Sequence, residues 1–246
     1  MTQPVREMVK ALLRGLFTVL SVDALFRCSQ RIARQAARLV HFRDWELVAR
    51  GRPQFYNHQL NLYQWRFDPR QWAFTARGVY PRERMFPGCT VLDLCCGDGS
   101  YSYLFFSDIA GSVDAVDNDR MAIEYARKTY LADNLRFYRL DAVRDPFPAS
   151  GYDVIVLNAA ISYFSEAEIG VILEKIVRAL VPNGFCYGMT PVANDYIDHK
   201  TEFEGGAALE RVLRHFFSTV DIKLIDEVGA KNLYFCATGP VSTAKG

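Results

Sequence analysis

Short apolar runs alternate with helix-spaced patterns from residue 90 to the C-terminus. The helical segments carry apolar residues every three or four positions, as amphipathic helices do, and the apolar runs between them have the length of buried strands. The expected strands are 90–94, 112–116, 135–140, 154–157 and 185–189, and the expected helices are 101–106, 121–130, 167–180 and 207–217. Strands and helices in alternation predict a parallel sheet covered on both faces, which is an α/β fold.

Two elements of this pattern are especially well defined. Ser165 and Glu168 form a capping box ahead of a stripe of apolar residues at helical spacing. The chain closes with two strand-like runs, 220–225 and 233–237, which flank a short turn around Gly229. Such a pair predicts an antiparallel hairpin at the edge of the sheet.

The first 85 residues differ from the rest in charge and aromatic content. They hold 15 basic and 6 acidic side chains, against 14 and 22 in residues 86–246. Two stretches with helical spacing lie near the start, and eight aromatic residues follow between positions 55 and 80. We therefore expect three parts: a basic amphipathic helical extension at 1–54, an aromatic lid or substrate segment at 55–85, and the main domain at 86–240.

The basic helical pattern has more than one explanation. Such helices can lie on an anionic membrane or on RNA, but a helix packed on its own domain with a solvated basic face fits as well. An Arg-rich, acid-poor start also suits an organellar transit peptide. No uncharged stretch here approaches the roughly 20 residues that span a bilayer. We expect a cytoplasmic protein that can touch a membrane peripherally through residues 1–40.

The cysteines carry little functional signal. Six are scattered without a C-x-x-C pair or a Cys/His cluster, which argues against a zinc site and against a disulfide framework. The net charge of +1 is close to neutral and does not indicate an acidic binding partner. We therefore predict no metal and do not expect nucleic acid as a partner.

The loop after the first expected strand carries the candidate chemistry. Gly97 and Gly99 permit positive φ angles and a close backbone approach, and the following helix start offers free N–H donors. These features indicate a nucleotide-like ligand at the strand ends, although a purely structural turn would also explain them. Ser102 stands where a dinucleotide site has its third glycine, and Asp93 would repel a pyrophosphate. A ligand with ammonium and sulfonium charges and no phosphate is favoured.

Two further acids follow at the ends of the next strands. Asp117 closes the second strand, where a carboxylate can accept both ribose hydroxyls, and Asp141 closes the third, where it can accept from an adenine amino group. Each acid alone could instead cap a helix or solvate a loop. The ordered set, with Asp93, is the pattern expected for S-adenosylmethionine.

With these motifs the chain resembles the class I S-adenosylmethionine-dependent methyltransferases of the small-molecule type, over about residues 55–238. The resemblance implies a Rossmann-like, seven-stranded, mostly parallel sheet with an antiparallel last strand. Cys95 departs from the family, because glycine is usual there. The cofactor-binding residues that the resemblance implies are Asp93, Cys95, Gly97, Gly99, Asp117, Asn118, Asp141, Ala142 and Asn158.

The resemblance also points to an acceptor side. Residues 158–164 correspond to the floor between cofactor and substrate and lack the Pro-Pro signature of nucleic-acid and glutamine N-methyltransferases. Tyr163 either positions the acceptor or is only a packed aromatic residue. His199 is the candidate general base, with Glu202 to orient it or replace it, and a plain surface-loop histidine is the alternative.

Four residues of the N-terminal part are expected to contribute to substrate binding. These are His58, Tyr63, Trp65 and Arg77. His58 is also a second candidate base. The aromatic residues could equally do no more than cover a face of the sheet.

The sequence thus predicts an enzyme that moves a methyl group from S-adenosyl-L-methionine to oxygen or nitrogen of a small-molecule or lipid-linked acceptor, such as a saccharide or secondary metabolite. A homodimer is a possible state of it. One alternative is a cofactor-binding regulatory or scaffold protein without catalysis. The other is an RNA methyltransferase that docks through the N-terminal arginines, which the near-neutral charge and the missing Pro-Pro signature disfavour.

Overall fold

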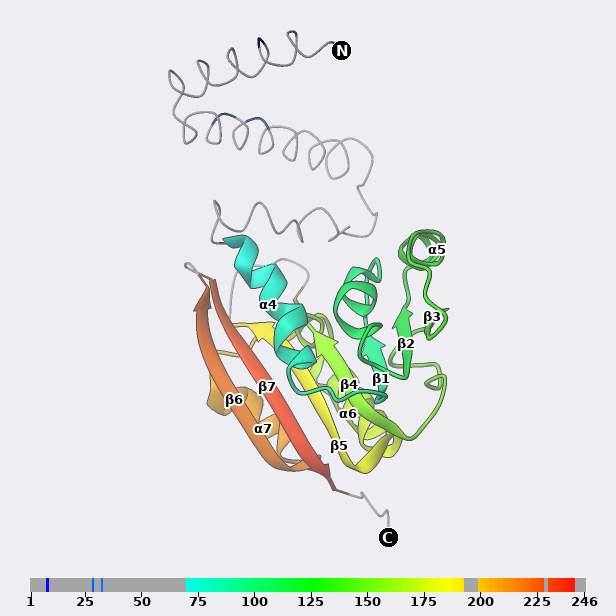
Figure 1. Ribbon diagram of the computed structural model, residues 1–246. Helices are drawn as coiled ribbons and strands as arrows, with labels where there is room; N and C mark the ends of the chain where they lie inside the picture. Colours follow the sequence, from blue (N-terminus) through cyan, green and yellow to red (C-terminus); the bar gives the residue numbers. More distant parts are fainter. Residues whose placement is uncertain are drawn as a thin grey trace. The chain divides into compact units, whose positions relative to one another are not determined.

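The computed structural model describes residues 70–192, 199–227 and 230–241, together with Met8, Cys28 and Ile32 (Figure 1). The chain divides into two compact units, Met1–Arg52 and Pro53–Gly246. In the first unit the three described residues are helical and exposed. Across the described ranges, no helix has the length and apolar character that crossing a membrane requires.

The second unit contains seven strands and the helices that cover them. The elements are α4 (Arg70–Arg82), β1 (Thr90–Leu94), the π-helical turn η2 (Ser102–Phe106), β2 (Ser112–Asp117), α5 (Arg120–Thr129), β3 (Leu135–Arg139), β4 (Tyr152–Asn158), the 3-10 turn η3 (Ile161–Tyr163), α6 (Glu166–Ala179), β5 (Leu180–Pro191), α7 (Gly206–Leu213), β6 (Phe217–Glu227) and β7 (Ala230–Pro240).

The strands form one sheet in the order β3-β2-β1-β4-β5-β7-β6. Strands β1 to β5 are parallel, and β7 runs antiparallel to both of its neighbours, β5 and β6. The α/β, Rossmann-like, seven-stranded sheet with an antiparallel last strand is therefore confirmed. The expected terminal hairpin is also present, with β6 at the edge of the sheet.

Each face of the sheet buries its own apolar cluster, as the alternation of side chains along each strand requires. Helices α6 and α7 cover one face, where Leu92, Ile155 and Ile172 are almost fully buried. Helices α4 and α5 and the turn η2 lie over the other face (Figure 1), where Val91 and Val154 are buried. A sheet with two covered faces presents its strand ends as the open surface for ligands.

Local signals in the sequence set several element ends. Ser165 and Glu168 form the expected capping box at the start of α6. The helix expected at 207–217 is shorter, because α7 ends at Leu213 and Phe217 already opens β6. Phe217 is 1% exposed and lies opposite Pro240 of β7. Burial in the sheet therefore outweighs the helical spacing that continued into this apolar residue.

Candidate active site

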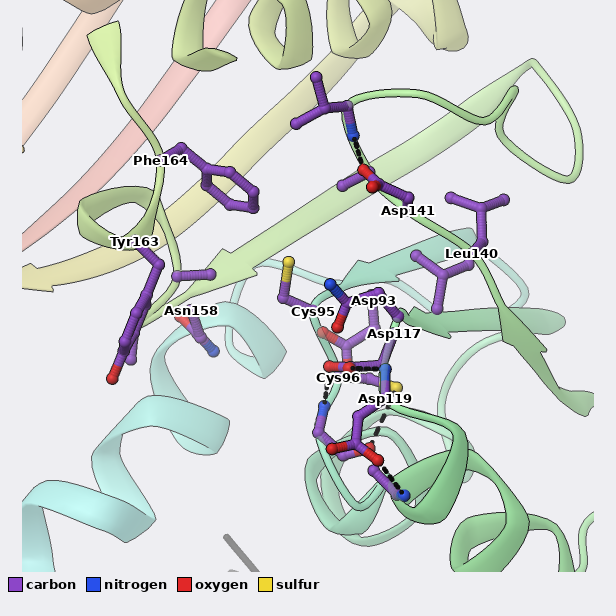
Figure 2. A pocket seen from close by; sticks show the side chains of 18 of the residues that line it. Asp93, Cys95, Cys96, Asp117, Asp119, Leu140, Asp141, Asn158, Tyr163 and Phe164 are labelled. Atoms are coloured by element: carbon purple, nitrogen blue, oxygen red, sulfur yellow. Dashed lines mark hydrogen bonds between the residues drawn. The ribbon is translucent and has the colours of Figure 1, made fainter. Parts of the chain in front are cut away.

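A pocket of about 620 Å³ opens at the carboxyl ends of the central strands. This is the edge of an open α/β sheet at which ligands generally bind. Its lining residues are Arg77, Asp93, Cys95, Cys96, Gly97, Tyr101, Val116, Asp117, Asn118, Asp119, Ala122, Leu140, Asp141, Ala142, Val143, Arg144, Asn158, Ala159, Ala160, Tyr163, Phe164, Glu168 and Lys200. Figure 2 shows this pocket with aspartates in its middle and aromatic side chains at one end.

The loop after β1 takes the conformation that its glycines predict. Gly97 and Gly99 have φ angles of 57° and 77°, in the region that glycine adopts without steric cost. The two glycines differ in role. Gly97 lines the pocket, whereas a Cβ atom at Gly99 would lie 2.4 Å from the ring of Phe137. Gly97 therefore adds no side chain to the pocket, and Gly99 allows the loop to pack on β3.

Asp93 is a buried acid at the end of β1. It is 4% exposed and accepts a hydrogen bond of 2.6 Å from Ser102 Oγ. Burial and the nearby negative charge of Asp117 raise the pKa of Asp93 to about 7, against the lowering effect of the Ser102 hydrogen bond. The serine that replaces the third glycine of a dinucleotide site thus serves this carboxyl group. A cationic ligand group beside Asp93 would relieve the cost of its ionisation.

Asp117 links the glycine loop to the end of β2. One of its oxygens accepts from the backbone N–H of Gly97 and the other from that of Asp119, each at 2.9 Å. Burial raises its pKa, and these two hydrogen bonds act in the opposite direction. Asp119, not Asp117, caps α5, because its side chain accepts from the backbone N–H groups of Met121 and Ala122. Asp117 therefore does not act as the helix cap and stays at the pocket wall.

Asp141 lies in a tightly bonded turn after β3. Its Oδ1 accepts from the backbone N–H groups of Val143 and Arg144 at 2.9 and 3.2 Å. Lys175 of α6 fastens the same turn from outside, since its Nζ donates to the carbonyls of Ala142 at 2.5 Å and Asp145 at 2.6 Å. The turn is thereby held in one position beside the pocket.

Two buried polar atoms of the pocket wall have no partner. Asn158 Nδ2 at the end of β4 donates to the carbonyl of Arg77 on α4 at 2.7 Å. Asn158 Oδ1 and Arg77 Nε, which are buried, form no hydrogen bond. Arg77 also stacks over the Phe74 ring, with 4.9 Å from its guanidinium carbon to the ring centroid. An acceptor and a donor from adjacent residues are thus available to a bound molecule.

The aromatic end of the pocket is built from η3 and the segment that follows β5. Tyr163 and Phe164 line it. The backbone N–H groups of Lys200 and Thr201 donate to the carbonyl of Ser162 at 2.8 and 3.1 Å. The segment that begins at His199, after β5, is therefore held against η3 by hydrogen bonds.

Side chains strengthen the same junction. Lys200 Nζ lies 3.2 Å from Glu168 Oε2. The ring of His199 meets that of Tyr163 edge to face, with 4.9 Å between centroids. The His199 side chain thus lies next to the pocket wall and contacts a residue that forms it.

The structure brings most of the predicted site residues together. Those that line the pocket are Asp93, Cys95, Gly97, Asp117, Asn118, Asp141, Ala142, Asn158, Tyr163 and Arg77. Gly99, His199 and Glu202 do not line it, and Glu202 is exposed. The predicted substrate residues His58, Tyr63 and Trp65 lie outside the described residues.

For several residues that line the pocket, no pattern in the sequence predicts this position. Leu140 and Phe164 are ordinary apolar residues in sequence, and their place in the pocket follows only from the tertiary fold. Asp119 could have been found, because an acid directly before a helix is a typical N-cap and α5 begins at Arg120. Lys200 lines the pocket and follows His199 directly in the chain, so the candidate base marks its neighbourhood.

The chain is similar to known methyltransferases over part of its length. Residues 91–184 match a family model described as a methyltransferase domain. The chain is 34% identical over 112 residues, 43% of its length, to the ribosomal protein arginine N-methyltransferase rmt3 of Schizosaccharomyces pombe, and covers 20% of that protein. It is 26% identical over 102 residues, 39% of its length, to the demethylmenaquinone methyltransferase of Lactococcus lactis, and covers 40% of it. The matches thus span a fifth to two fifths of these relatives.

A solved structure shows the same fold. The N-methyltransferase NodS from Bradyrhizobium japonicum, in complex with S-adenosyl-L-homocysteine, superimposes with a TM-score of 0.58 at 14% identity, over 74% of this chain and 95% of that one. Residues 91–184 therefore correspond to a methyltransferase domain, and the likeness to NodS shows the fold. S-adenosyl-L-methionine is the cofactor that these findings support.

The pocket fits that cofactor chemically. Its wall carries three carboxylates, Asp93, Asp117 and Asp141, which suit a ligand with cationic groups and hydroxyl donors. The unpartnered Asn158 Oδ1 and Arg77 Nε suit the ammonium and the carboxylate of an amino acid. The donors and acceptors present thus match both ends of the molecule.

Proposed function

We propose that this protein transfers the methyl group of S-adenosyl-L-methionine to an oxygen or nitrogen atom of a small-molecule or lipid-linked acceptor, such as a saccharide or secondary metabolite. The single observation that carries this proposal is the pocket at the ends of β1, β2 and β3, in which Asp93, Asp117 and Asp141 come together beside the glycine loop. The methyltransferase domain matched at residues 91–184 supports it.

The cofactor would be held at its two ends by different residues. Asp117 would accept the ribose hydroxyls with lone pairs that the N–H groups of Gly97 and Asp119 leave free. Asp141 would accept from the adenine amino group. At the other end, the carboxylate of Asp93 and Asn158 Oδ1 would accept from the ammonium group, and Arg77 would pair with the carboxylate.

The chemistry asks for placement more than for covalent help. The bound cofactor supplies an activated methyl group on a sulfonium ion. The protein's part is to hold an acceptor atom in line with that methyl carbon and to keep water away. The rings of Tyr163 and Phe164, which line the acceptor end of the pocket, can do both and can also stabilise a cation at their faces.

The acceptor class is supported by the pocket and by one relative. A volume of about 620 Å³ lies within the range of small-molecule sites. The Lactococcus relative is named for demethylmenaquinone, a small molecule, whereas the Schizosaccharomyces relative is named for ribosomal protein arginine. We therefore favour a small molecule as the acceptor.

A hydroxyl acceptor also needs a base, and an amine acceptor that binds neutral does not. His199 remains our candidate: it does not line the pocket, but its ring contacts that of Tyr163, which does. We expect His199→Ala to lower turnover by about 100-fold while cofactor affinity is unchanged if His199 is the base. A rate within a few-fold of wild type would eliminate it, and Glu202→Gln is the next variant.

The proposal is tested by two measurements on the whole chain. Calorimetry with S-adenosyl-L-homocysteine should detect binding that Asp117→Ala abolishes and that Asp133→Asn, an exposed acid away from the pocket, leaves unchanged. A panel of matched hydroxyl and amine acceptors, with released S-adenosyl-L-homocysteine as readout, should then show turnover. Undiminished binding by Asp117→Ala would refute the ribose assignment.

A non-catalytic cofactor-binding protein is the second candidate. It gains from the observation that no histidine described by the structure lines the pocket. The acceptor panel separates the two functions, because cofactor binding without turnover on any hydroxyl, amine or RNA substrate would support the regulatory role.

A further inference from the structure

Two residues of the pocket have an unusual backbone conformation. Over the ranges that the structure describes, Cys95 and Ala159 are the non-glycine residues with positive φ, at 58° and 51°. Only a few per cent of non-glycine residues adopt this region, since a Cβ atom there crowds the backbone. Both residues line the pocket.

The two positions are related by the sheet. Cys95 directly follows β1 and Ala159 directly follows β4, and these strands pair in parallel with Asp93 opposite Val156. The two strained residues therefore leave neighbouring strands at the same edge. At each position glycine would adopt the positive φ angle at no steric cost. The turn therefore does not explain why cysteine and alanine are present, and their side chains need another explanation.

Cys95 lies in the middle of the pocket. Figure 2 shows its sulfur atom pointing into the open space, with Phe164, Tyr163 and Asn158 on one side and Asp93 and Asp117 on the other. The proposed adenosine contacts, Asp117 and Asp141, lie on one side of it, and Asn158, one of the proposed amino-acid contacts, lies on the other. The sulfonium centre of the cofactor joins these two ends, so it has to pass Cys95.

The thiol is suited to that neighbourhood. Burial and the charges of Asp117, Asp93 and Asp141 raise the pKa of the Cys95 thiol, which keeps it protonated. A protonated thiol is a poor nucleophile. It can therefore lie next to an electrophilic methyl group as an inert, space-filling side chain.

We propose that Cys95 and Ala159 together limit the size of the group on the cofactor's sulfur, admitting methyl and excluding larger alkyl groups. The inference rests on the proposed function, because it assumes that S-adenosyl-L-methionine occupies this pocket. Both residues line the pocket from two neighbouring strand ends, at the cost of two left-handed residues. Selectivity of this kind comes from a clash with the larger ligand, not from a new contact with the smaller one.

The test compares the affinities of S-adenosyl-L-methionine, S-adenosyl-L-ethionine and S-adenosyl-L-homocysteine by calorimetry. One extra methylene in a confined site is discriminated by about tenfold or more, so wild type should bind the methyl compound at least that much more tightly than the ethyl compound. In Cys95→Gly and in Ala159→Gly the ratio should fall to within about threefold. The ratio is taken within each variant, so a change in the folded fraction cancels.

Two further variants sharpen the result. Cys95→Ala keeps the Cβ atom and removes only the sulfur, and its ratio should lie between those of wild type and Cys95→Gly. Cys186→Ala removes a fully buried thiol of β5 that does not line the pocket, and its ratio should equal that of wild type.

The outcomes separate this inference from the function on which it rests. Wild type that binds the methyl and ethyl compounds equally, or glycine variants that keep the wild-type ratio, would overturn the size limit and leave the proposed function intact. Wild type that binds none of the three compounds would overturn the proposed function and the size limit together.

Discussion

Neutralising Asp93 should have opposite effects on stability and on cofactor binding. Burial raises the pKa of this carboxyl group from 3.8 to about 7. A folded-state pKa above the unfolded value means that the protonated acid stabilises the fold below pH 3.8 and that this contribution is lost as the pH rises through about 7. The difference between the two values corresponds to about 4 kcal/mol. Asp93 is 4% exposed, so solvent screening reduces this figure little.

The assay is urea unfolding of wild type and Asp93→Asn at pH 4 and pH 8. Asparagine keeps an oxygen that can accept from Ser102 Oγ, so the hydrogen bond of 2.6 Å can persist. The free energy of unfolding of the variant minus that of wild type should increase by about 4 kcal/mol between the two pH values. Other titrating groups cancel in this double difference. A change below about 1 kcal/mol would refute the claim that burial raises the pKa of the Asp93 carboxyl group.

The pH dependence of ligand binding should be opposite to that of stability. An ammonium group favours ionised Asp93, so the affinity of wild type for S-adenosyl-L-homocysteine should rise by about 30-fold from pH 5.5 to pH 8.5, with release of one proton below pH 7. Asp93→Asn should bind about 100-fold more weakly than wild type at pH 8.5. It should also lose this pH dependence, whereas Asp133→Asn should behave as wild type. A pH profile shared by wild type and Asp93→Asn would exclude Asp93 as the ammonium partner.

The remaining predictions concern the loops that frame the pocket. Lys175→Met should weaken S-adenosyl-L-homocysteine binding by about tenfold, because the turn at Ala142 loses two hydrogen bonds to Lys175 Nζ; calorimetry checks this, and unchanged affinity would show that the turn holds its shape unaided. Gly99→Ala should destabilise the protein by at least about 2 kcal/mol in urea, since its Cβ would lie 2.4 Å from the Phe137 ring at a φ of 77°. Gly151→Ala, at a φ of 84° with nothing within 4 Å, isolates the backbone cost at about 1 kcal/mol. Equal losses in the two variants would contradict the packing role of Gly99.

Much of the fold could be predicted because local signals and burial agree. The capping box at Ser165 and Glu168 and the apolar stripe behind it gave α6, and the repeated order of strand and helix gave the parallel sheet. The end of α7 was predicted too late, because Phe217 continues the helical spacing although it belongs to β6. Periodicity alone cannot separate a helix end from the start of a buried strand.

The candidate site also has features that the sequence predicts and features that it does not. Asp93, Asp117 and Asp141 could be predicted because parallel strands place their carboxyl ends at one edge. The partners of these acids could not, since the hydrogen bond from Ser102 to Asp93 and the bracing of the Asp141 turn by Lys175 join residues through the tertiary fold. The left-handed conformation of Ala159 had no signal, because alanine in a loop does not reveal its φ angle.

The central claim is that the carboxylates at the strand ends bind an adenosyl amino acid. Calorimetric titration of the whole chain with S-adenosyl-L-homocysteine at pH 8 tests it most directly, with wild type and Asp117→Ala side by side. We predict one binding site in wild type and no detectable heat of binding in the variant. A folded wild-type protein that takes up no ligand, or a variant that binds as tightly as wild type, would contradict the claim.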